Sequence, residues 1–181
     1  MSFRIDRIAD LLHGGGVIAY PTEGVFGLGC LPDDKQAILR LLRIKERDPA
    51  MGLILIASRP DQLEGWVESC SDIPEPEAEK PITWIAPKGP LAHPLVTGLH
   101  DGIAVRLCTN PIAASLCDAV DMPLVSTSAN ISGRPVARNQ YVLHRIFRNT
   151  ADAIVGGRCG PASGPSEIRV LASDRVVRKG S

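Results

Sequence analysis

Aromatic residues are scarce in this sequence: Phe, Trp and Tyr together make up 4% of its 181 residues. Proteins that bind single-stranded nucleic acid stack bases on exposed rings, so this scarcity argues against a surface built mainly to bind RNA. An excess of one charge is also missing, because 20 basic residues balance 20 acidic ones. The net charge therefore does not indicate nucleic acid or an anionic membrane as a partner, although it is compatible with a local basic patch.

The sequence also lacks the signatures of disulfide-rich and metal-binding proteins. Its five cysteines are odd in number and scattered, no CxxC pair occurs, and its four histidines share no spacing typical of metal ligands. We expect reduced thiols in or near the core. No Ser-His-Asp or Cys-His constellation and no carboxylate cluster can be assembled. Catalysis by positioning and electrostatic stabilisation, as in phosphoryl and nucleotidyl transfer, is the form of catalysis that remains.

Long apolar runs are absent as well, and none approaches the length needed to span a bilayer. The first ten residues mix acidic and basic side chains, which argues against a signal peptide. We therefore expect a soluble, cytoplasmic protein without a membrane partner. A chain of 181 residues with 44% hydrophobic and 22% charged residues is long enough for one large core. The expected organisation is a single domain over residues 1–181.

Segments with helical periodicity alternate with short apolar runs through most of the chain, so the expected fold class is α/β. Helices are predicted at residues 3–13, 33–46, 58–68, 110–120 and 139–149. Strands are predicted at residues 17–20, 53–57, 82–86, 103–107, 123–127 and 153–155, with a terminal hairpin of strands 167–171 and 175–178. Residues 87–101, rich in proline and glycine, are expected to be a loop.

A glycine-punctuated stretch at residues 20–30, YPTEGVFGLGC, follows the first predicted strand and precedes a predicted helix. We expect it to be a strand-to-helix loop, the place where open α/β sheets often bind small molecules. Its glycines allow positive φ or a close approach of the backbone to a ligand. Thr22 and Glu23 would place a hydroxyl and a carboxylate at the mouth of the loop. On these residues alone, a ligand cradle and a simple turn are equally supported.

Two further clusters lie beside predicted strands. Lys45-Glu46-Arg47 ends a helix just before a buried strand, and the sequence STSAN at residues 126–130 follows another strand. Cations neutralise phosphates while hydroxyls and amides orient them, so both clusters suit an anionic ligand with several oxygens. A solvated helix end and a hydroxyl-rich helix cap are the alternatives. Arg106 interrupts the apolar run IAVRL, and a charge there requires a partner, for which we expect a ligand carboxylate.

Five segments occur in an order that resembles one known family: YPTEGVFGLGC, LLRIKERDPAMGLILIA, GIAVRL, PLVSTSANISGRP and PSEIR. They are similar to the motifs of the YrdC-like family, the threonylcarbamoyl-AMP synthases, and most similar to its short bacterial form. The resemblance extends from about residue 13 to the C-terminus. It implies a twisted, mostly open mixed sheet with flanking helices and a concave basic cavity.

The resemblance also implies an activity. The family forms L-threonylcarbamoyladenylate and diphosphate from L-threonine, bicarbonate or CO2, and ATP, with Mg2+ accompanying the ATP. The product serves the modification of tRNA next to the anticodon, so tRNA or the proteins that transfer the threonylcarbamoyl group are expected partners. The alternative is a non-catalytic protein that binds RNA or a nucleotide in the same cavity.

The family's motifs assign roles to nine residues of this chain. Catalysis is assigned to Lys45 and Arg47. Threonine binding is assigned to Thr22, Arg106 and Ser128. Nucleotide binding is assigned to Lys45, Arg47, Thr83, Asn130, Arg138 and Ser166. Met51 stands where short relatives often carry a further lysine.

Overall fold

Nine strands form one mixed sheet in the computed structural model, which describes residues 2–137 and 139–180. Their order across the sheet is β7-β1-β2-β6-β3-β5-β4-β8-β9. The strands are β1 (Ile18–Pro21), β2 (Phe26–Cys30), β3 (Ile54–Ala57), β4 (Ile82–Pro87), β5 (Gly102–Leu107), β6 (Leu124–Ser128), β7 (Ala153–Ile154), β8 (Glu167–Val170) and β9 (Val176–Arg178). Strand β3 is parallel to β5 and antiparallel to β6. The predicted α/β class with an open mixed sheet is confirmed.

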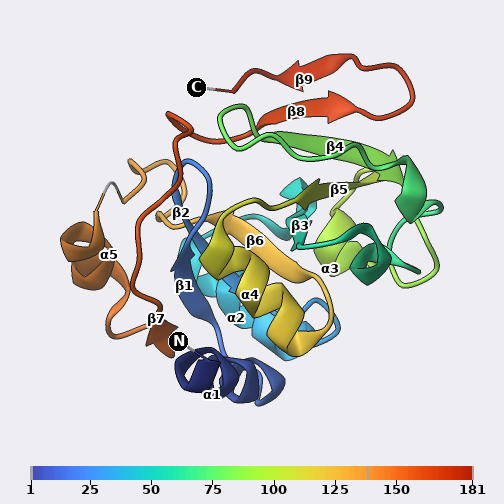
Figure 1. Cartoon of the computed structure of the whole chain (residues 1–181). Helices are drawn as coiled ribbons and strands as arrows, with labels where there is room; N and C mark the ends of the chain where they lie inside the picture. The colour runs from blue at the N-terminus through green and yellow to red at the C-terminus, as the bar shows by residue number, and fades with distance from the viewer. Residues whose placement is uncertain (1, 138, 181) are drawn as a thin grey trace.

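Helices cover both faces of the central strands. They are α1 (Ser2–His13), α2 (Lys35–Lys45), α3 (Pro94–Thr97), α4 (Pro111–Val120) and α5 (Gln140–Phe147). Strand β1 shows how the two faces arise: Ile18 packs in one core with residues of α1 and α4, whereas Ala19 packs in the other with residues of α2 and α5. This alternation follows from the two-residue period of a strand. In Figure 1, α4 lies in front of the central strands, α2 lies behind them and α1 lies at the bottom of the view.

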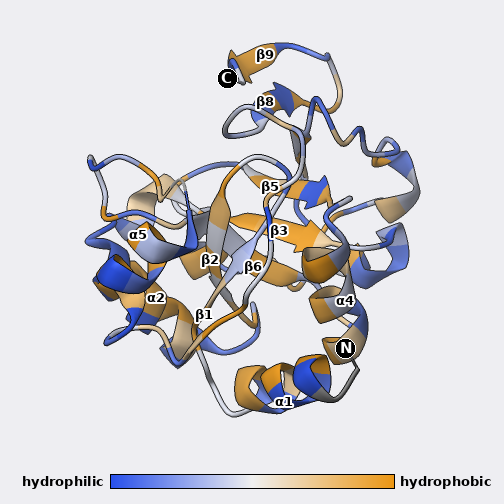
Figure 2. Ribbon diagram, turned by 60° about the vertical axis from the view of Figure 1, so that its left-hand side comes forward, coloured by the Kyte–Doolittle hydropathy of each residue, from blue (hydrophilic) through white to orange (hydrophobic). Residues whose placement is uncertain are grey.

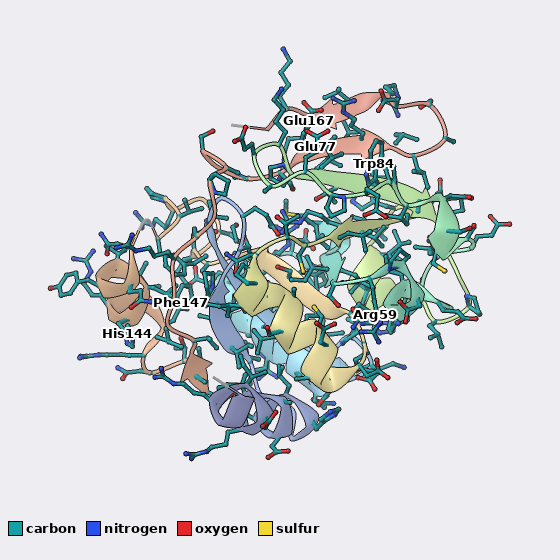
Figure 3. All side chains as sticks on the ribbon, in the orientation of Figure 1. Arg59, Glu77, Trp84, His144, Phe147 and Glu167 are labelled. Atoms are coloured by element: carbon teal, nitrogen blue, oxygen red, sulfur yellow. The ribbon has the colours of Figure 1, made fainter. Side chains whose placement is uncertain are left out.

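Apolar residues gather at the centre of this arrangement. The apolar run predicted at residues 53–57 forms β3, which is orange in the middle of Figure 2. Leu55 joins the core of α2 and Ile56 joins the core of α4, so β3 is buried on both faces, as its continuous apolar sequence predicts. On α5, Phe147 points into the core while the exposed His144 points away from it (Figure 3). No helix of the described chain is both long and apolar enough to span a membrane.

The glycine-rich stretch at residues 20–30 corrects one prediction, because it forms a hairpin of β1 and β2 instead of a loop between a strand and a helix. Its glycines lie where another backbone or ring comes close, and none of them has a positive φ. A Cβ atom on Gly29 would lie 2.2 Å from the carbonyl oxygen of Val125 in β6. A Cβ atom on Gly24 would lie 2.0 Å from the carbonyl oxygen of Gly164. Close approach of the backbone therefore explains these two glycines.

Two other predicted segments differ from the structure. The helix expected at residues 58–68 is only a 3-10 turn, Pro60–Leu63, because Gly65 has a φ of 76° and the chain turns to bridge Val67 with Lys88. The loop expected at residues 87–101 contains the short helix α3. Arg59, just before the 3-10 turn, forms ion pairs with Asp118 and Asp121 at the end of α4 (Figure 3). These pairs fix the turn to α4 although it is too short to be a helix.

The C-terminal part of the chain returns to the hairpin β1–β2 and forms hydrogen bonds with it. Gly160 N–H donates to Thr22 O at 2.9 Å, and Ala162 N–H donates to Glu23 O at 3.2 Å. The chain then forms β8, which pairs in parallel with β4, and β9, which pairs antiparallel with β8 as predicted. In Figure 1, β4, β8 and β9 extend beyond the helices at the top of the view. A cavity lies between this C-terminal part of the chain and the hairpin β1–β2.

Candidate active site

The cavity is lined by residues from five separate parts of the chain. The hairpin β1–β2 contributes Thr22, Gly24, Val25 and Gly27; the end of α2 and β3 contribute Arg47 and Ile54; β5 contributes Arg106; β6 contributes Ser126, Thr127 and Ser128; and the C-terminal segment contributes Gly164, Pro165, Ser166 and Arg178. Three arginines and several hydroxyls thus face one space, and none of the carboxylates of the described chain lines it. Such a lining suits a ligand with several anionic oxygens.

Lys45 and Arg47 point in different directions because helix α2 ends between them. Glu46 adopts the left-handed conformation with a φ of 50°, and its N–H donates to Arg43 O while Arg47 N–H donates to Leu42 O. A non-glycine residue with positive φ is uncommon. Here it ends the helix so that Lys45 turns into the protein and Arg47 faces the cavity. The two cations of the KER segment therefore have different roles.

Lys45 is 2% exposed and holds the STSAN segment in place. Its Nζ donates to the carbonyl oxygen of Ser128, to the carbonyl oxygen of Asn130 at 2.8 Å and to Asn130 Oδ1 at 3.2 Å. An ammonium group has three N–H bonds, so these acceptors use all of them. Burial, with a smaller contribution from the charge of Arg47, lowers the pKa of Lys45 to about 8. The structure thus places Lys45 behind the cavity wall, as the group that supports Ser128 and Asn130.

Arg47 is fixed by the turn that follows it. Its Nε and Nη2 donate to Gly52 O at 3.2 and 2.9 Å, and Nη2 lies 3.4 Å from Met51 O. No described residue accepts a hydrogen bond from Nη1. Burial and the charge of Arg178 both lower the pKa of Arg47, as expected where cations gather around one cavity. Met51 contributes its carbonyl oxygen to this geometry, and the residue is 56% exposed.

Ser128 and Asn130 form one hydrogen-bonded unit at the end of β6. Ser128 Oγ donates to Asn130 Oδ1 at 2.7 Å, and Asn130 Nδ2 donates to Ile131 O and Arg134 O at 3.0 and 2.7 Å. Ser128 lines the cavity, whereas Asn130 does not and its amide is bonded within the segment. Asn130 therefore shapes the segment that presents Ser128. The alternative for the STSAN segment, a hydroxyl-rich helix cap, is wrong: α5 is capped by Asn139, whose side chain accepts from Val142 N.

Arg106 already has a carboxylate partner inside the protein, and its binding of a ligand carboxylate remains a prediction. Its Nη2 lies 3.1 Å from Glu23 Oε2, and the two residues are 7% and 1% exposed. Glu23 is therefore buried against β5 and does not lie at the mouth of a loop. Thr22 lines the cavity beside Arg106, and its hydroxyl donates to Val25 O at 2.7 Å.

Thr83 and Ser166 are joined by a hydrogen bond of 2.7 Å between their hydroxyls. Ser166 lines the cavity, whereas Thr83 is fully buried in β4 behind it. Thr83 thus orients Ser166. The remaining predicted site residue, Arg138, lies outside the residues that the structure describes.

Arg178 is the cavity residue that the sequence patterns missed. It extends from β9 and its Nη2 donates to Ser166 O at 2.8 Å. Partial burial and the charge of Arg106 lower its pKa. No local pattern marks it, because VVRK at the end of the chain is an ordinary edge-strand sequence. Arg178 reaches the cavity only because β9 pairs with β8 across the sheet.

The part of the chain that the structure describes contains five cysteines, four histidines and many carboxylates as possible metal ligands. No group of three or more histidines, cysteines and carboxylates among them could hold a metal ion. The cavity itself offers hydroxyls and carbonyls among three arginines, whereas Mg2+ is usually held by carboxylates and water. These residues do not fit a metal ion held by the protein alone.

Comparison with protein families identifies the chain. The model of the Sua5/YciO/YrdC family, described as telomere recombination, matches residues 10–180. The chain belongs to this family. Among curated members, the threonylcarbamoyl-AMP synthase of Xanthomonas euvesicatoria pv. vesicatoria is 44% identical over 182 residues, covering 96% of either chain. The threonylcarbamoyl-AMP synthase of Cellvibrio japonicus is 41% identical over 179 residues, covering 97% of this chain and 95% of the other.

Solved structures of the Sua5/YciO/YrdC family share the fold. P. abyssi Sua5 complexed with L-threonine matches with a TM-score of 0.88 and 28% identity over 99% of this chain. The chain spans only 55% of that Sua5 chain. E. coli YciO matches with a TM-score of 0.82 and 25% identity, over 99% of this chain and 90% of the other.

Proposed function

We propose that this protein is a threonylcarbamoyl-AMP synthase, which forms L-threonylcarbamoyladenylate and diphosphate from L-threonine, bicarbonate or CO2, and ATP. The observation that carries the proposal is the cavity in which Arg47, Arg106 and Arg178 face the hydroxyls of β6 without a lining carboxylate. Two of the substrates are anions that must be brought together, and the arginines offset their repulsion. Membership of the Sua5/YciO/YrdC family and the names of its curated members agree with this function.

The reaction needs little covalent chemistry from the protein. The amino nitrogen of threonine combines with CO2 to give a carbamate and release a proton. A carbamate oxygen then attacks the α-phosphorus of ATP, the bond between that phosphorus and the bridging oxygen to the β-phosphate breaks, and diphosphate leaves with the electron pair. Negative charge moves onto the diphosphate during this step. Fixed cations beside the leaving group stabilise the transition state more than the ground state and so accelerate the reaction.

The residues divide between the two substrates. We assign Arg106 and Thr22 to the carboxylate and the hydroxyl or amine of threonine. Arg47 and Arg178 are assigned to the phosphates of ATP. Ser128 is assigned to these phosphates as well, in place of the threonine binding that the family's motifs imply. Mg2+ enters with the triphosphate as part of the substrate, because the cavity residues do not form a metal site of their own.

One assay tests the function. Diphosphate release is measured with ATP, L-threonine and bicarbonate together and with each omitted in turn. We expect release only in the complete mixture. Release that does not depend on threonine would refute the synthase, and nucleotide or RNA binding without any release would support the non-catalytic alternative.

Replacing Arg178 tests the contribution of the C-terminal strand. We expect Arg178→Ala to raise the KM for ATP roughly tenfold or more, because a hydrogen bond to a charged group contributes about 1.5–3 kcal/mol. The neighbouring Lys179→Ala is the matched control, since it removes a cation that does not line the cavity. Steady-state diphosphate release at saturating threonine gives the KM for ATP of both variants. Equal KM values for the two variants would remove Arg178 from the site.

The lowered pKa of Lys45 predicts a pH dependence of nucleotide binding. Lys45 is charged below about pH 8 and loses its proton as the pH rises through that value. The loss removes a positive charge beside Arg47 and one of the three N–H groups that hold Ser128 and Asn130. We expect the affinity for Mg·ATP, measured by calorimetry without threonine or bicarbonate, to fall several-fold between about pH 7 and about pH 9.5. An affinity that stays constant over this interval would contradict the role of the charge.

We also propose what accepts the threonylcarbamoyl group of the product. A mixed anhydride of a carbamate and a phosphate is reactive, so a second protein is expected to transfer the threonylcarbamoyl group to tRNA. Binding of tRNA or of that transferase by this chain remains a prediction. We also propose that the protein works in the cytoplasm, where ATP and tRNA are available.

A further inference from the structure

Glu23 is a buried carboxylate that touches the site from behind without lining it. It is 1% exposed, and its Oε2 lies 3.1 Å from Nη2 of Arg106. Its Oε1 accepts from the backbone N–H groups of Thr109 and Asn110 at 2.8 and 3.2 Å, at the start of helix α4. Glu23 thus joins three elements: the β1–β2 hairpin, strand β5 and the N-terminus of α4.

Arg106 depends on this carboxylate for its charge balance. It is 7% exposed, and Glu23 is the one ion-pair partner that the described residues provide for it. Its Nε has no hydrogen-bond partner among them. Arg178 lines the same cavity and adds a like charge, since the charge of Arg106 is one reason why the pKa of Arg178 is lowered. Without Glu23, repulsion from Arg178 and the cost of burial would both favour a different position of the guanidinium.

Thr22, the neighbour of Glu23, is held by Asn110, the residue whose backbone N–H donates to Glu23. The side-chain amide of Asn110 donates to Thr22 O at 3.1 Å, and its Oδ1 caps α4 by accepting from the N–H of Ile112. The two groups assigned to the amino-acid substrate, Thr22 and Arg106, are therefore held at a set separation by one buried carboxylate and one capping amide.

We propose that Glu23 is a positioning residue that holds the Arg106 guanidinium, together with Thr22, in the geometry that receives the carboxylate of the amino-acid substrate. The role rests on the proposed function, because it presumes that threonine binds beside Arg106. A purely structural role explains the geometry less well. A buried ion pair contributes little net stability compared with apolar residues of the same volume, so stability alone gives little reason for the pair. The ion pair of Glu23 and Arg106 lies between the cavity and the N-terminus of α4. This position is explained if the pair orients Arg106.

The variant Glu23→Gln tests this role with little change in shape. A glutamine oxygen still accepts from Thr109 and Asn110, but its amide cannot pair with Arg106. We expect the KM for L-threonine to rise about tenfold, the effect of losing one charged hydrogen bond between Arg106 and the substrate carboxylate, while the KM for ATP changes less than about twofold. A KM does not depend on the fraction of folded enzyme, so partial unfolding would lower kcat without producing this split.

Asp152→Asn is the matched control. Asp152 also accepts from a backbone N–H, that of Val17 at 2.8 Å, and also pairs with an arginine, Arg40 at 2.7 Å, but it does not line the cavity. We expect both of its KM values to equal those of the unmodified protein. The double variant Glu23→Gln/Arg106→Gln gives a second test. If Glu23 acts through Arg106, the double variant has the same threonine KM as Arg106→Gln alone.

The outcomes separate this role from the proposed function. Direct binding of L-threonine, measured by calorimetry, accompanies the kinetic assay. A threonine KM that is unchanged in Glu23→Gln, or that rises together with the KM for ATP, overturns the positioning role while the synthase stands. A further loss of threonine affinity in the double variant overturns it as well. If the unmodified protein neither binds threonine nor releases diphosphate with it, the proposed function and this role both fail.

Discussion

Replacing Arg47 by alanine is expected to lower the rate of diphosphate release by a factor of about 100 to 1,000. Removal of one preorganised electrostatic group from an active site typically has an effect of this size. We expect the variant to remain folded. Arg47 lines the cavity together with Arg178, so its charge faces the space that we assign to the anionic substrates. Its hydrogen bonds within the protein involve only Gly52 O and Met51 O. Their loss is expected to cost little stability.

Arg43→Ala is the control for this variant. Arg43 belongs to the last turn of the same helix, is exposed, and donates only to Leu39 O at 3.3 Å within the described chain. We expect kcat and both KM values of Arg43→Ala to match those of the unmodified protein. Thermal unfolding of Arg43→Ala should occur within about 2 °C of the unmodified protein, since surface changes usually alter stability by less than about 0.5 kcal/mol. Normal turnover in Arg47→Ala would remove the electrostatic role assigned to this residue.

The elements of the fold that the sequence predicts correctly are those with local signals. Asn110 followed by Pro111 marks the start of α4, and the structure confirms the cap: Asn110 Oδ1 accepts from Ile112 N and Ala113 N. The apolar run of β3 identifies a strand buried on both faces in the same way. The hairpin at residues 20–30 was predicted wrongly because the reason for its glycines is not local. Gly29 is required by the carbonyl of Val125, about a hundred positions away in the chain.

The site residues that the sequence predicts correctly are also those with local signals. The clusters around Arg47 and Ser128 stand out because polar residues follow apolar strands or helices, and the structure brings both to one cavity. The opposite directions of Lys45 and Arg47 depend on the left-handed conformation of Glu46, a residue type that does not favour it, so the sequence does not reveal them. Arg178 and the buried position of Glu23 depend on which strands become neighbours.

Replacing Lys45 by methionine is expected to abolish activity through a different route from Arg47→Ala. Methionine has a similar length and fills the same buried space, but it removes the ammonium donor from three oxygens of Ser128 and Asn130. Ser128 O still accepts from Asn130 N–H and Asn130 Oδ1 from Ser128 Oγ, whereas Asn130 O keeps no donor among the described residues. An unsatisfied buried acceptor costs about 1–3 kcal/mol, while removal of a buried charge returns part of this cost. We expect a net loss of about 2 kcal/mol in the free energy of unfolding, which corresponds to a fall in Tm of about 4–8 °C for a domain of this size.

The measurement that distinguishes the two variants combines calorimetric unfolding with diphosphate release. Lys45→Met should lose both stability and activity, because Ser128 can no longer be held against the phosphates. Arg47→Ala should lose activity alone. Lys35→Met, at the exposed first residue of the same helix, is the control for a lysine-to-methionine change and should lose neither. If Lys45→Met keeps the Tm of the unmodified protein but loses activity, the ammonium acts on the substrate and does not support the segment at residues 128–130. If it keeps its activity, the supported segment is not part of the phosphate site.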